Sequence, residues 1–191
     1  MLTLLASVWL VALPNIPLWR QLAQLPEVTG LRGLLFGLGL AFGVAGLTHA
    51  LLSLLNWRWL LKPVLTVFLL SAASGTYFMW SYGIVIDANM IVNVLQTDPR
   101  EAADLFNWRL LLSLGLLGVL PAWWLWRQPV RTVGALRRLG GNLLAFIASV
   151  VVLVISLMLI YQDFASVMRN HTQLRYLINP LNSFYAVGRV V

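Results

Sequence analysis

The sequence predicts an all-α membrane protein with five transmembrane helices and interfacial helices on the outer side. Of its 191 residues, 60% are hydrophobic and only 10% are charged, and the mean hydropathy is +0.85. A soluble domain carries about 25% charged residues. The composition therefore excludes a soluble enzyme, a disordered tail and a nucleic-acid-binding module. The net charge of +7 instead indicates orientation in a membrane and contact with anionic lipid.

Five apolar runs reach or nearly reach the length of about 20 residues that a membrane span requires. None of them contains Asp, Glu, Lys or Arg. The predicted spans are residues 1–19, 33–55, 64–82, 110–126 and 142–160, in one domain of residues 1–191, with periplasmic segments at 83–108 and 161–191. Pro121 predicts a kink in the fourth span, which membrane helices tolerate when neighbours satisfy the freed carbonyl.

Basic residues predict the direction of the spans. They are in excess on one set of loops, at Arg58, Lys62, Arg127, Arg131, Arg137 and Arg138. The positive-inside rule then places the N-terminus in the cytoplasm and the C-terminus outside. Every tryptophan except Trp9 falls at a predicted span end, which is typical of an aromatic belt at the membrane interfaces.

Residues 83–108 carry polar side chains four residues apart, at Asn89, Asn93 and Thr97. On a helix these would share one face, and their amide and hydroxyl groups can hold a phospholipid headgroup. A solvated polar face of an interfacial helix is the alternative. The run from Asp98 to Glu101 predicts a new helix start, in which Asp98 is the N-cap and Glu101 its capping partner. Glu101 thus also has a purely structural explanation.

Residues 161–191 predict an amphipathic helix on the outer leaflet, because apolar side chains follow helical spacing from Phe164 to Ile178. Pro180 is expected to end this helix at Asn179. Arg169 and Arg175 can bind lipid phosphate, since a guanidinium offers two parallel hydrogen bonds. Snorkelling of the same side chains to the membrane interface is the alternative.

The sequence offers no metal or cofactor site of its own. It has no cysteine, and its two histidines, His49 and His171, are too far apart in the sequence to suggest a zinc site. A glycine-rich phosphate loop and a Ser-His-Asp constellation are also absent. His49 lies within the second span and is expected to be neutral and hydrogen-bonded. Glycines spaced four residues apart in that span predict close intramolecular helix packing.

The two periplasmic segments resemble the N-terminal membrane domain of the lipid A phosphoethanolamine transferases, which include the mobile colistin-resistance enzymes. The resemblance covers nearly the whole chain and is sharp from Tyr77 onward. The matching residues are Tyr77-Phe78, Tyr82 to Asp87, Met90-Ile91, Asn93, Thr97-Asp98, Glu101, Asp163 to Ser166, Met168 to His171, Leu174-Arg175 and Asn179-Pro180.

The resemblance implies a chain that modifies lipopolysaccharide in the bacterial inner membrane and contributes to polymyxin and colistin resistance. Such enzymes move phosphoethanolamine from phosphatidylethanolamine to a lipid A phosphate, by means of a zinc-bound threonine in a large C-terminal periplasmic domain. That catalytic domain is missing here, so this piece alone is expected to be inactive and to hold no zinc. The family's headgroup-binding residues map onto Asn93, Thr97 and Glu101, with Pro99 as a departure between the last two.

Two other functions share much of this topology. A small transporter or channel would place polar or charged residues along a midplane pathway, and here only His49 and the stretch from Pro14 to Pro17 offer anything similar. A non-catalytic membrane anchor would differ from a substrate-docking domain only at Asn93, Thr97 and the arginine-bearing tail.

Overall fold

The computed structural model describes residues 1–130 and 132–190, without the side chains of residues 99, 102 and 104. Arg131, a member of the predicted basic cluster, lies outside these residues. The described residues form helices and no strand. The helices are α1 (Leu2–Ala12), α2 (Ile16–Ala23), α3 (Gly30–Leu54), α4 (Leu61–Tyr82), α5 (Ala88–Gln96), α6 (Pro99–Asp104), α7 (Trp108–Ser113), η1 (Leu114–Val119), α8 (Leu120–Arg127), α9 (Ala135–Leu159), α10 (Tyr161–Asn170), η2 (Thr172–Leu177) and α11 (Leu181–Val190).

Four stretches of helix are long and apolar enough to cross a membrane: α3, α4, the continuous run 108–127, and α9. The pair α1 and α2 makes a fifth if it counts as one span, although it is bent by 45°. The predicted all-α membrane fold is therefore confirmed. The sequence suggested one unbroken run over residues 1–19, but Pro14 lacks the N–H that would continue α1. Pro17 sits in the first turn of α2, where the missing N–H has no helical partner to lose.

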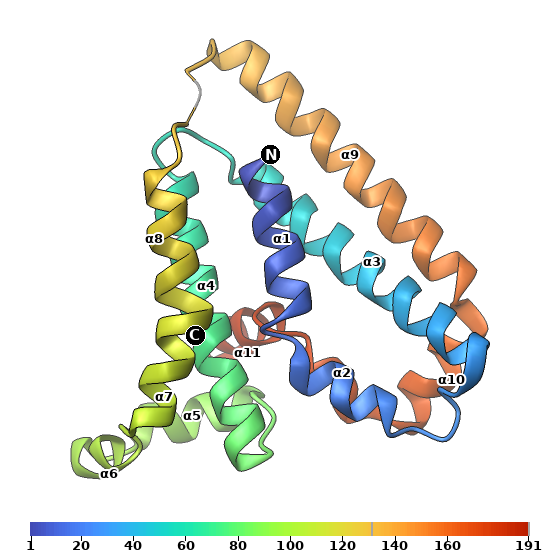
Figure 1. The fold of residues 1–191 in the computed structure, drawn as a ribbon, viewed down its shortest axis with the longest axis vertical. Coiled ribbons are helices and arrows are strands. Elements are labelled where there is room, and N and C mark those ends of the chain that lie inside the picture. Colours follow the sequence, from blue (N-terminus) through green and yellow to red (C-terminus); the bar gives the residue numbers. More distant parts are fainter. Residues whose placement is uncertain (131, 191) are drawn as a thin grey trace.

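The spans form two antiparallel pairs with α1 between them (Figure 1). One pair is α3 with α9, and the other is α4 with the run 108–127. At Gly46 of α3 an added Cβ would lie 2.9 Å from the carbonyl oxygen of Ser149 on α9, so glycine permits this close approach. His49, one turn later, hydrogen-bonds Ser149 through Nδ1 (2.6 Å) and Thr3 of α1 through Nε2 (3.2 Å).

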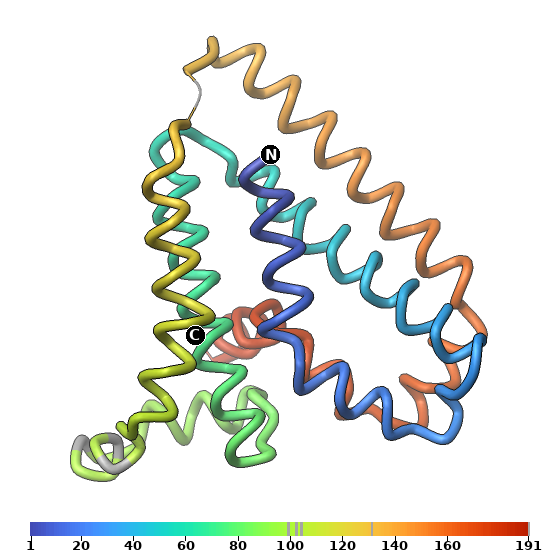
Figure 2. Tube along the Cα trace, viewed as in Figure 1, coloured from blue at the N-terminus to red at the C-terminus, as the bar shows by residue number. Residues whose placement is uncertain are grey.

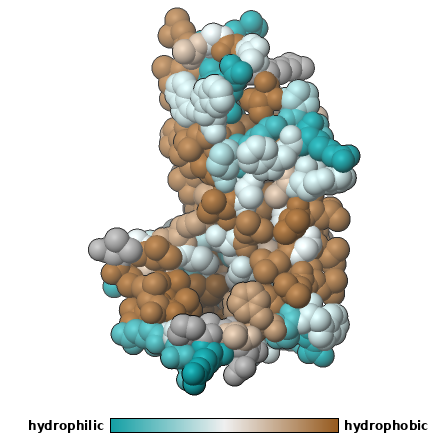
Figure 3. Space-filling view, turned by 90° about the vertical axis from the view of Figure 1, so that its left-hand side faces the viewer, coloured by the Kyte–Doolittle hydropathy of each residue, from teal (hydrophilic) through white to brown (hydrophobic). Residues whose placement is uncertain are grey.

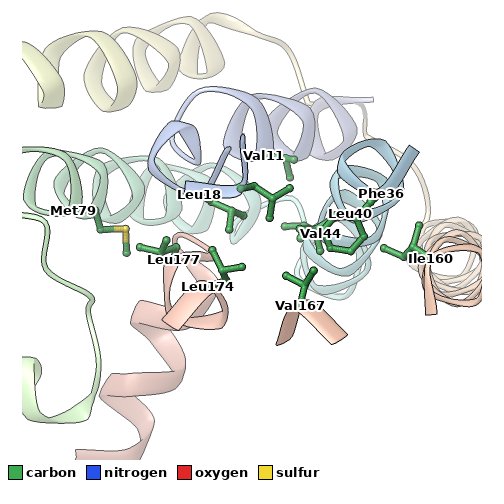
Figure 4. Close-up of a cluster of buried hydrophobic side chains, with 11 residues drawn as sticks. Val11, Leu18, Phe36, Leu40, Val44, Met79, Ile160, Val167, Leu174 and Leu177 are labelled. Atoms are coloured by element: carbon green, nitrogen blue, oxygen red, sulfur yellow. The ribbon is translucent and has the colours of Figure 1, made fainter. Parts of the chain in front are cut away.

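Two apolar clusters hold the helices together. Figure 4 shows the first, in which buried side chains of α2, α3, α10 and η2 converge on one another. Leu18, Phe36, Val167 and Leu174 are among its members. The second cluster joins α1, α3, α4 and α8 around residues such as Leu10 and Leu65. The first cluster fixes α10 and η2 to the membrane helices.

The fourth span contains a π-helical turn, η1, which ends two residues before Pro121. Proline has no N–H for the Leu117 carbonyl four residues earlier, as the sequence analysis anticipated. The indole nitrogen of Trp9 on α1 donates to that carbonyl at 3.3 Å. Trp9 was the tryptophan that did not fit the interfacial belt, and this bond gives it a reason to lie within a span.

The predicted amphipathic helix over 164–178 is interrupted. Helix α10 ends at Asn170, and η2 follows after His171. The interruption turns the chain inward, so that Leu174 and Leu177 are 1% and 2% exposed. Burial of these leucines in the core stabilises the interrupted arrangement over the single continuous helix that the apolar spacing predicted. The chain then passes through a cis peptide bond between Asn179 and Pro180 into α11, which lies near the middle of the long axis (Figure 2).

The surface matches a membrane protein. Figure 3 shows brown, apolar side chains over much of this face, with teal side chains at the bottom and a band of teal and white side chains across its upper part. Large apolar side chains are exposed along α3, α9 and the run 108–127. Trp59, Trp80 and Trp108, which lie near span ends, are all more than half exposed, as expected for indoles that meet the membrane interface.

Candidate functional site

Helix α5 lies at the surface, on the loop that follows the C-terminal end of α4. Gly83 ends α4 in the left-handed conformation (φ +64°), which glycine adopts without steric cost. Asp87 then caps α5 by accepting a hydrogen bond from the Met90 N–H at 2.8 Å. None of the α5 residues is buried, and the helix packs against α11.

Asn93 and Thr97 lie side by side at the end of α5. The Asn93 side chain is exposed, while Thr97 is partly buried and ends the helix in an extended conformation. The Thr97 hydroxyl donates to the Asn93 carbonyl at 2.7 Å. Because that bond uses its hydrogen, the hydroxyl retains only acceptor capacity. The exposed Asn93 amide still offers two donors and one acceptor to a ligand.

Glu101 belongs to a different helix. Helix α5 ends at Gln96 and α6 begins at Pro99, so the four-residue repeat does not continue along a single helical face. Asp98 accepts from the Arg100 N–H at 2.8 Å, as its predicted capping role requires. Glu101 is exposed, and within the described part of the chain no hydrogen bond or ion pair occupies its carboxylate.

The two predicted arginines lie in different settings. Arg169 is exposed in the last turn of α10. Arg175 lies in η2, where Nη2 donates to the Tyr176 hydroxyl at 2.8 Å and Cζ lies 4.7 Å from the Tyr176 ring centroid. Tyr176 in turn lines the pocket described next, so Arg175 borders that pocket while Arg169 is not among its lining residues.

A small polar pocket lies where the start of α5 meets the end of η2 and α11. Its volume is about 220 Å³, below the range typical of sites for whole drug-sized ligands, so it suits a headgroup rather than an entire lipid. It is lined by Asp87, Ala88, Asn89, Tyr176, Asn182, Tyr185, Ala186 and Arg189.

The pocket brings opposite charges and aromatic rings together. Asp87 supplies a carboxylate and Arg189 a guanidinium, with Tyr176 and Tyr185 in the same lining. Asn182 has a structural task, because its Nδ2 donates to the Ile86 carbonyl and, at 3.0 Å, to the Tyr176 carbonyl. These bonds join α11 to the segments that precede α5 and end η2.

Of the pocket residues, only Asn89 carried a functional interpretation in the sequence. Asn182, Tyr185 and Arg189 are three or four residues apart, so they share one face of α11. That spacing was the available signal, but residues 181–190 were not recognised as a separate helix. These residues lie near α5 because the chain turns between η2 and α11. Helical periodicity in the sequence does not predict such a contact between distant segments.

A metal centre has no evident ligands here. Among the described residues no group of three or more His, Asp or Glu side chains could hold a metal ion.

Comparison with known proteins supports the same family that the motifs suggested. The family model for phosphoethanolamine transferases EptA/EptB matches residues 44–191. Phosphoethanolamine transferase EptA of Escherichia coli K12 is 34% identical over 188 residues, and phosphatidylethanolamine transferase Mcr-1 of Escherichia coli is 32% identical over 189 residues. Each match covers 96% of this chain but only 34% of the relative, so the chain spans about a third of these proteins' length.

The fold agrees as well. The integral membrane protein lipooligosaccharide phosphoethanolamine transferase A of Neisseria meningitidis superposes with a TM-score of 0.91 at 24% sequence identity. The superposition covers 98% of this chain and 35% of that protein. The matched part of these relatives is their N-terminal membrane domain. This chain therefore belongs to the EptA/EptB family of phosphoethanolamine transferases.

Proposed function

We propose that this chain is the membrane and substrate-docking domain of an enzyme that moves phosphoethanolamine from phosphatidylethanolamine to a lipid A phosphate. The observation that carries the proposal is the junction of α5 with α11, in a chain that belongs to this family. The junction forms a pocket that contains both a carboxylate and a guanidinium, and exposed Asn93 follows the pocket residue Asn89 by one turn of α5.

The chemistry of the pocket suits a zwitterionic headgroup. An ammonium group is attracted by the Asp87 carboxylate and by the faces of Tyr176 and Tyr185. A phosphate is attracted by Arg189, since hydrogen bonds between ionised partners are about twice as strong as neutral ones. Asn93, Thr97 and Glu101 on α5 and α6, with Arg169 and Arg175 on the tail, are proposed as further contacts for lipid headgroups along the same outer surface.

The role of the domain is positional. Two-thirds of the length of the relatives lies outside this match, and we assign the chemistry, with its zinc-bound nucleophile, to a C-terminal catalytic domain. Tethering that domain to the membrane raises the effective concentration of the lipid substrates. Holding the headgroup also orients the scissile phosphodiester, and correct orientation of the reacting bond lowers the activation barrier of the transfer. On this proposal residues 1–191 alone are inactive.

The proposed orientation places the N-terminus in the cytoplasm and α5, α10 and α11 on the periplasmic side of the inner membrane. The chain has no cysteine, so single cysteines can report topology without background. Asn170→Cys should react with a membrane-impermeant maleimide in intact spheroplasts, and Val133→Cys should react only after lysis. The reverse pattern would contradict the orientation.

The docking role is tested by Asn93→Ala and Thr97→Ala in the full-length protein. Each should lower the fraction of lipid A that carries phosphoethanolamine, measured by mass spectrometry, while protein level and zinc content stay unchanged. Asn170→Ala, an exposed asparagine of α10, is the matched control. If lipid A modification is unchanged in both variants, the headgroup role fails and a plain membrane anchor is favoured.

A further inference from the structure

A second hollow, which shares no lining residue with the polar pocket, lies between α1 and α8. Both helices pack against α4, and between them they leave an apolar groove of about 610 Å³. Its α1 wall includes Ala6, Trp9 and Ala12, and its α8 wall includes Pro121, Trp123 and Trp124. The small side chains and the proline supply little bulk, so the groove stays open between the indole rings.

The groove is about as long as one leaflet of a membrane is thick. Helix α1 has 11 residues, which at 1.5 Å per residue gives roughly 17 Å. Half of a hydrocarbon core about 30 Å thick is about 15 Å. Leu2 and Leu13, at opposite ends of α1, both line the groove, so it follows nearly the whole of this helix.

The end of the groove nearest the start of α1 and the end of α8 (Figure 1) carries positive charge. The guanidinium carbon of Arg127 lies 3.9 Å from the ring centroid of Trp123, a groove residue. Lys62 Nζ donates to the Trp126 carbonyl at 2.8 Å on the same turn of α8. The sequence has no Asp or Glu in residues 55–64 or 120–138, so these cations meet no opposing carboxylate from their own segments.

We propose that this groove binds an acyl chain of an anionic glycerophospholipid, with the headgroup phosphate on Arg127 and Lys62. In the predicted orientation the lipid belongs to the cytoplasmic leaflet. The groove lies at the opposite end of the molecule from α5, so this inference does not rest on the proposed docking of phosphoethanolamine.

The two cations at one end of the groove favour a lipid over a helix from a partner or a second copy. An anionic glycerophospholipid supplies both a phosphate for these cations and an acyl chain for the apolar walls. Lipid tails are as apolar as leucine, so the groove alone does not select a headgroup. The preference for an anionic lipid comes from Arg127 and Lys62, because cations at the membrane surface attract anionic headgroups.

The test uses native mass spectrometry of the protein at its full natural length. The delipidated protein is titrated with phosphatidylglycerol and phosphatidylcholine of identical acyl chains, because neither lipid is the proposed substrate. Wild type should bind the first phosphatidylglycerol several-fold more tightly than phosphatidylcholine. Equal affinity for the two lipids would overturn the proposal without any variant being made.

Variants then locate the site. Ala6→Phe with Ala12→Phe should fill the groove and lower the affinity for both lipids, whereas Val151→Phe on the exposed face of α9 should not. Lys62→Gln with Arg127→Gln should remove the headgroup preference but leave acyl binding, whereas Arg109→Gln, at the opposite end of the same span, should keep both. Unchanged binding in the filled variant, or loss of a dimer on filling, would overturn the proposal, the latter in favour of a second copy.

Discussion

Asn15 and Asn179 exchange two hydrogen bonds across 164 positions of sequence. The Asn179 N–H donates to Asn15 Oδ1 at 2.9 Å, and Asn15 Nδ2 donates to the Asn179 carbonyl at 2.7 Å. Both residues are almost fully buried. Asn15 Nδ2 also donates to the Leu10 carbonyl at 2.8 Å, near the end of α1. The pair therefore holds the bend between α1 and α2 against the segment that begins α11.

Asn15→Ala should destabilise the fold by about 3 kcal/mol, because it leaves the backbone groups of Asn179 and Leu10 buried without partners. The measurement is reversible unfolding in mixed micelles, followed by circular dichroism. Asn170→Ala, which alters an exposed side chain, should change the free energy of unfolding by less than about 0.5 kcal/mol. Equal effects of the two substitutions would mean that the buried pair contributes nothing specific.

Two glycine substitutions should have opposite effects. At Gly75 of α4 an added Cβ would lie 2.6 Å from Asn179 Oδ1, and the Asn179 amide cannot retreat freely, because Nδ2 donates to the Ala72 carbonyl at 2.6 Å. At Gly37 of α3 an added Cβ meets nothing within 4 Å. Gly75→Ala should therefore lower the free energy of unfolding, while Gly37→Ala should raise it by up to about 1 kcal/mol through helix propensity.

Thermal unfolding of the two variants beside wild type checks this pair. Both substitutions add the same methyl group to a membrane helix, so a difference in sign isolates the contact with Asn179. Destabilisation of the same size at both positions would contradict the assigned role of Gly75.

The membrane helices could be predicted from sequence because span length and the absence of charge are local properties. The same local reasoning placed the cap at Asp98 and the freed carbonyl before Pro121. It could not find the pair of Asn15 and Asn179, because neither asparagine lies on a periodic face and their contact depends on the tertiary fold.

The outer surface was predictable only in part, for a related reason. Helical spacing on α5 correctly placed Asn89 and Asn93 on one helix, but Thr97 ends that helix and Glu101 lies on the next. The pocket forms only if Arg189 lies near Asp87 in the fold. The turn at Asn179 directs α11 toward α5 and so brings Arg189 to that position. Whether these side chains bind a headgroup stays a prediction.

Trp9 and Pro121 should be energetically coupled. Trp9→Phe removes the indole donor to the Leu117 carbonyl, which should lower the free energy of unfolding by about 1 kcal/mol. In a Pro121→Ala background, residue 121 regains an N–H that can donate to the same carbonyl. Trp9→Phe should therefore lower the free energy of unfolding by less in that background. A double-mutant cycle on the free energy of unfolding measures the difference. Strict additivity of the two substitutions would show that the indole bond does not compensate for the proline.

Arg189→Gln in the full-length protein should lower phosphoethanolamine transfer by roughly 10- to 150-fold, since a hydrogen bond to a charged group contributes about 1.5–3 kcal/mol. Arg137→Gln, in the first turn of α9, removes the same charge and should leave transfer unchanged. Transfer is measured on lipid A extracted from cells that express equal amounts of each variant. Equal losses in both variants would indicate a general effect of net charge.

Asp87→Asn tests the other half of the pocket with little disturbance of the fold. Asparagine is as good an N-cap as aspartate, so α5 should keep its bond from the Met90 N–H while the carboxylate charge is lost. If Asp87 holds the ammonium, the variant should lose discrimination between donors with a primary ammonium and donors with a quaternary one, in competition assays with the corresponding phospholipids. A variant that loses transfer and α5 structure together, detected by proteolysis within residues 83–98, would assign Asp87 to capping alone.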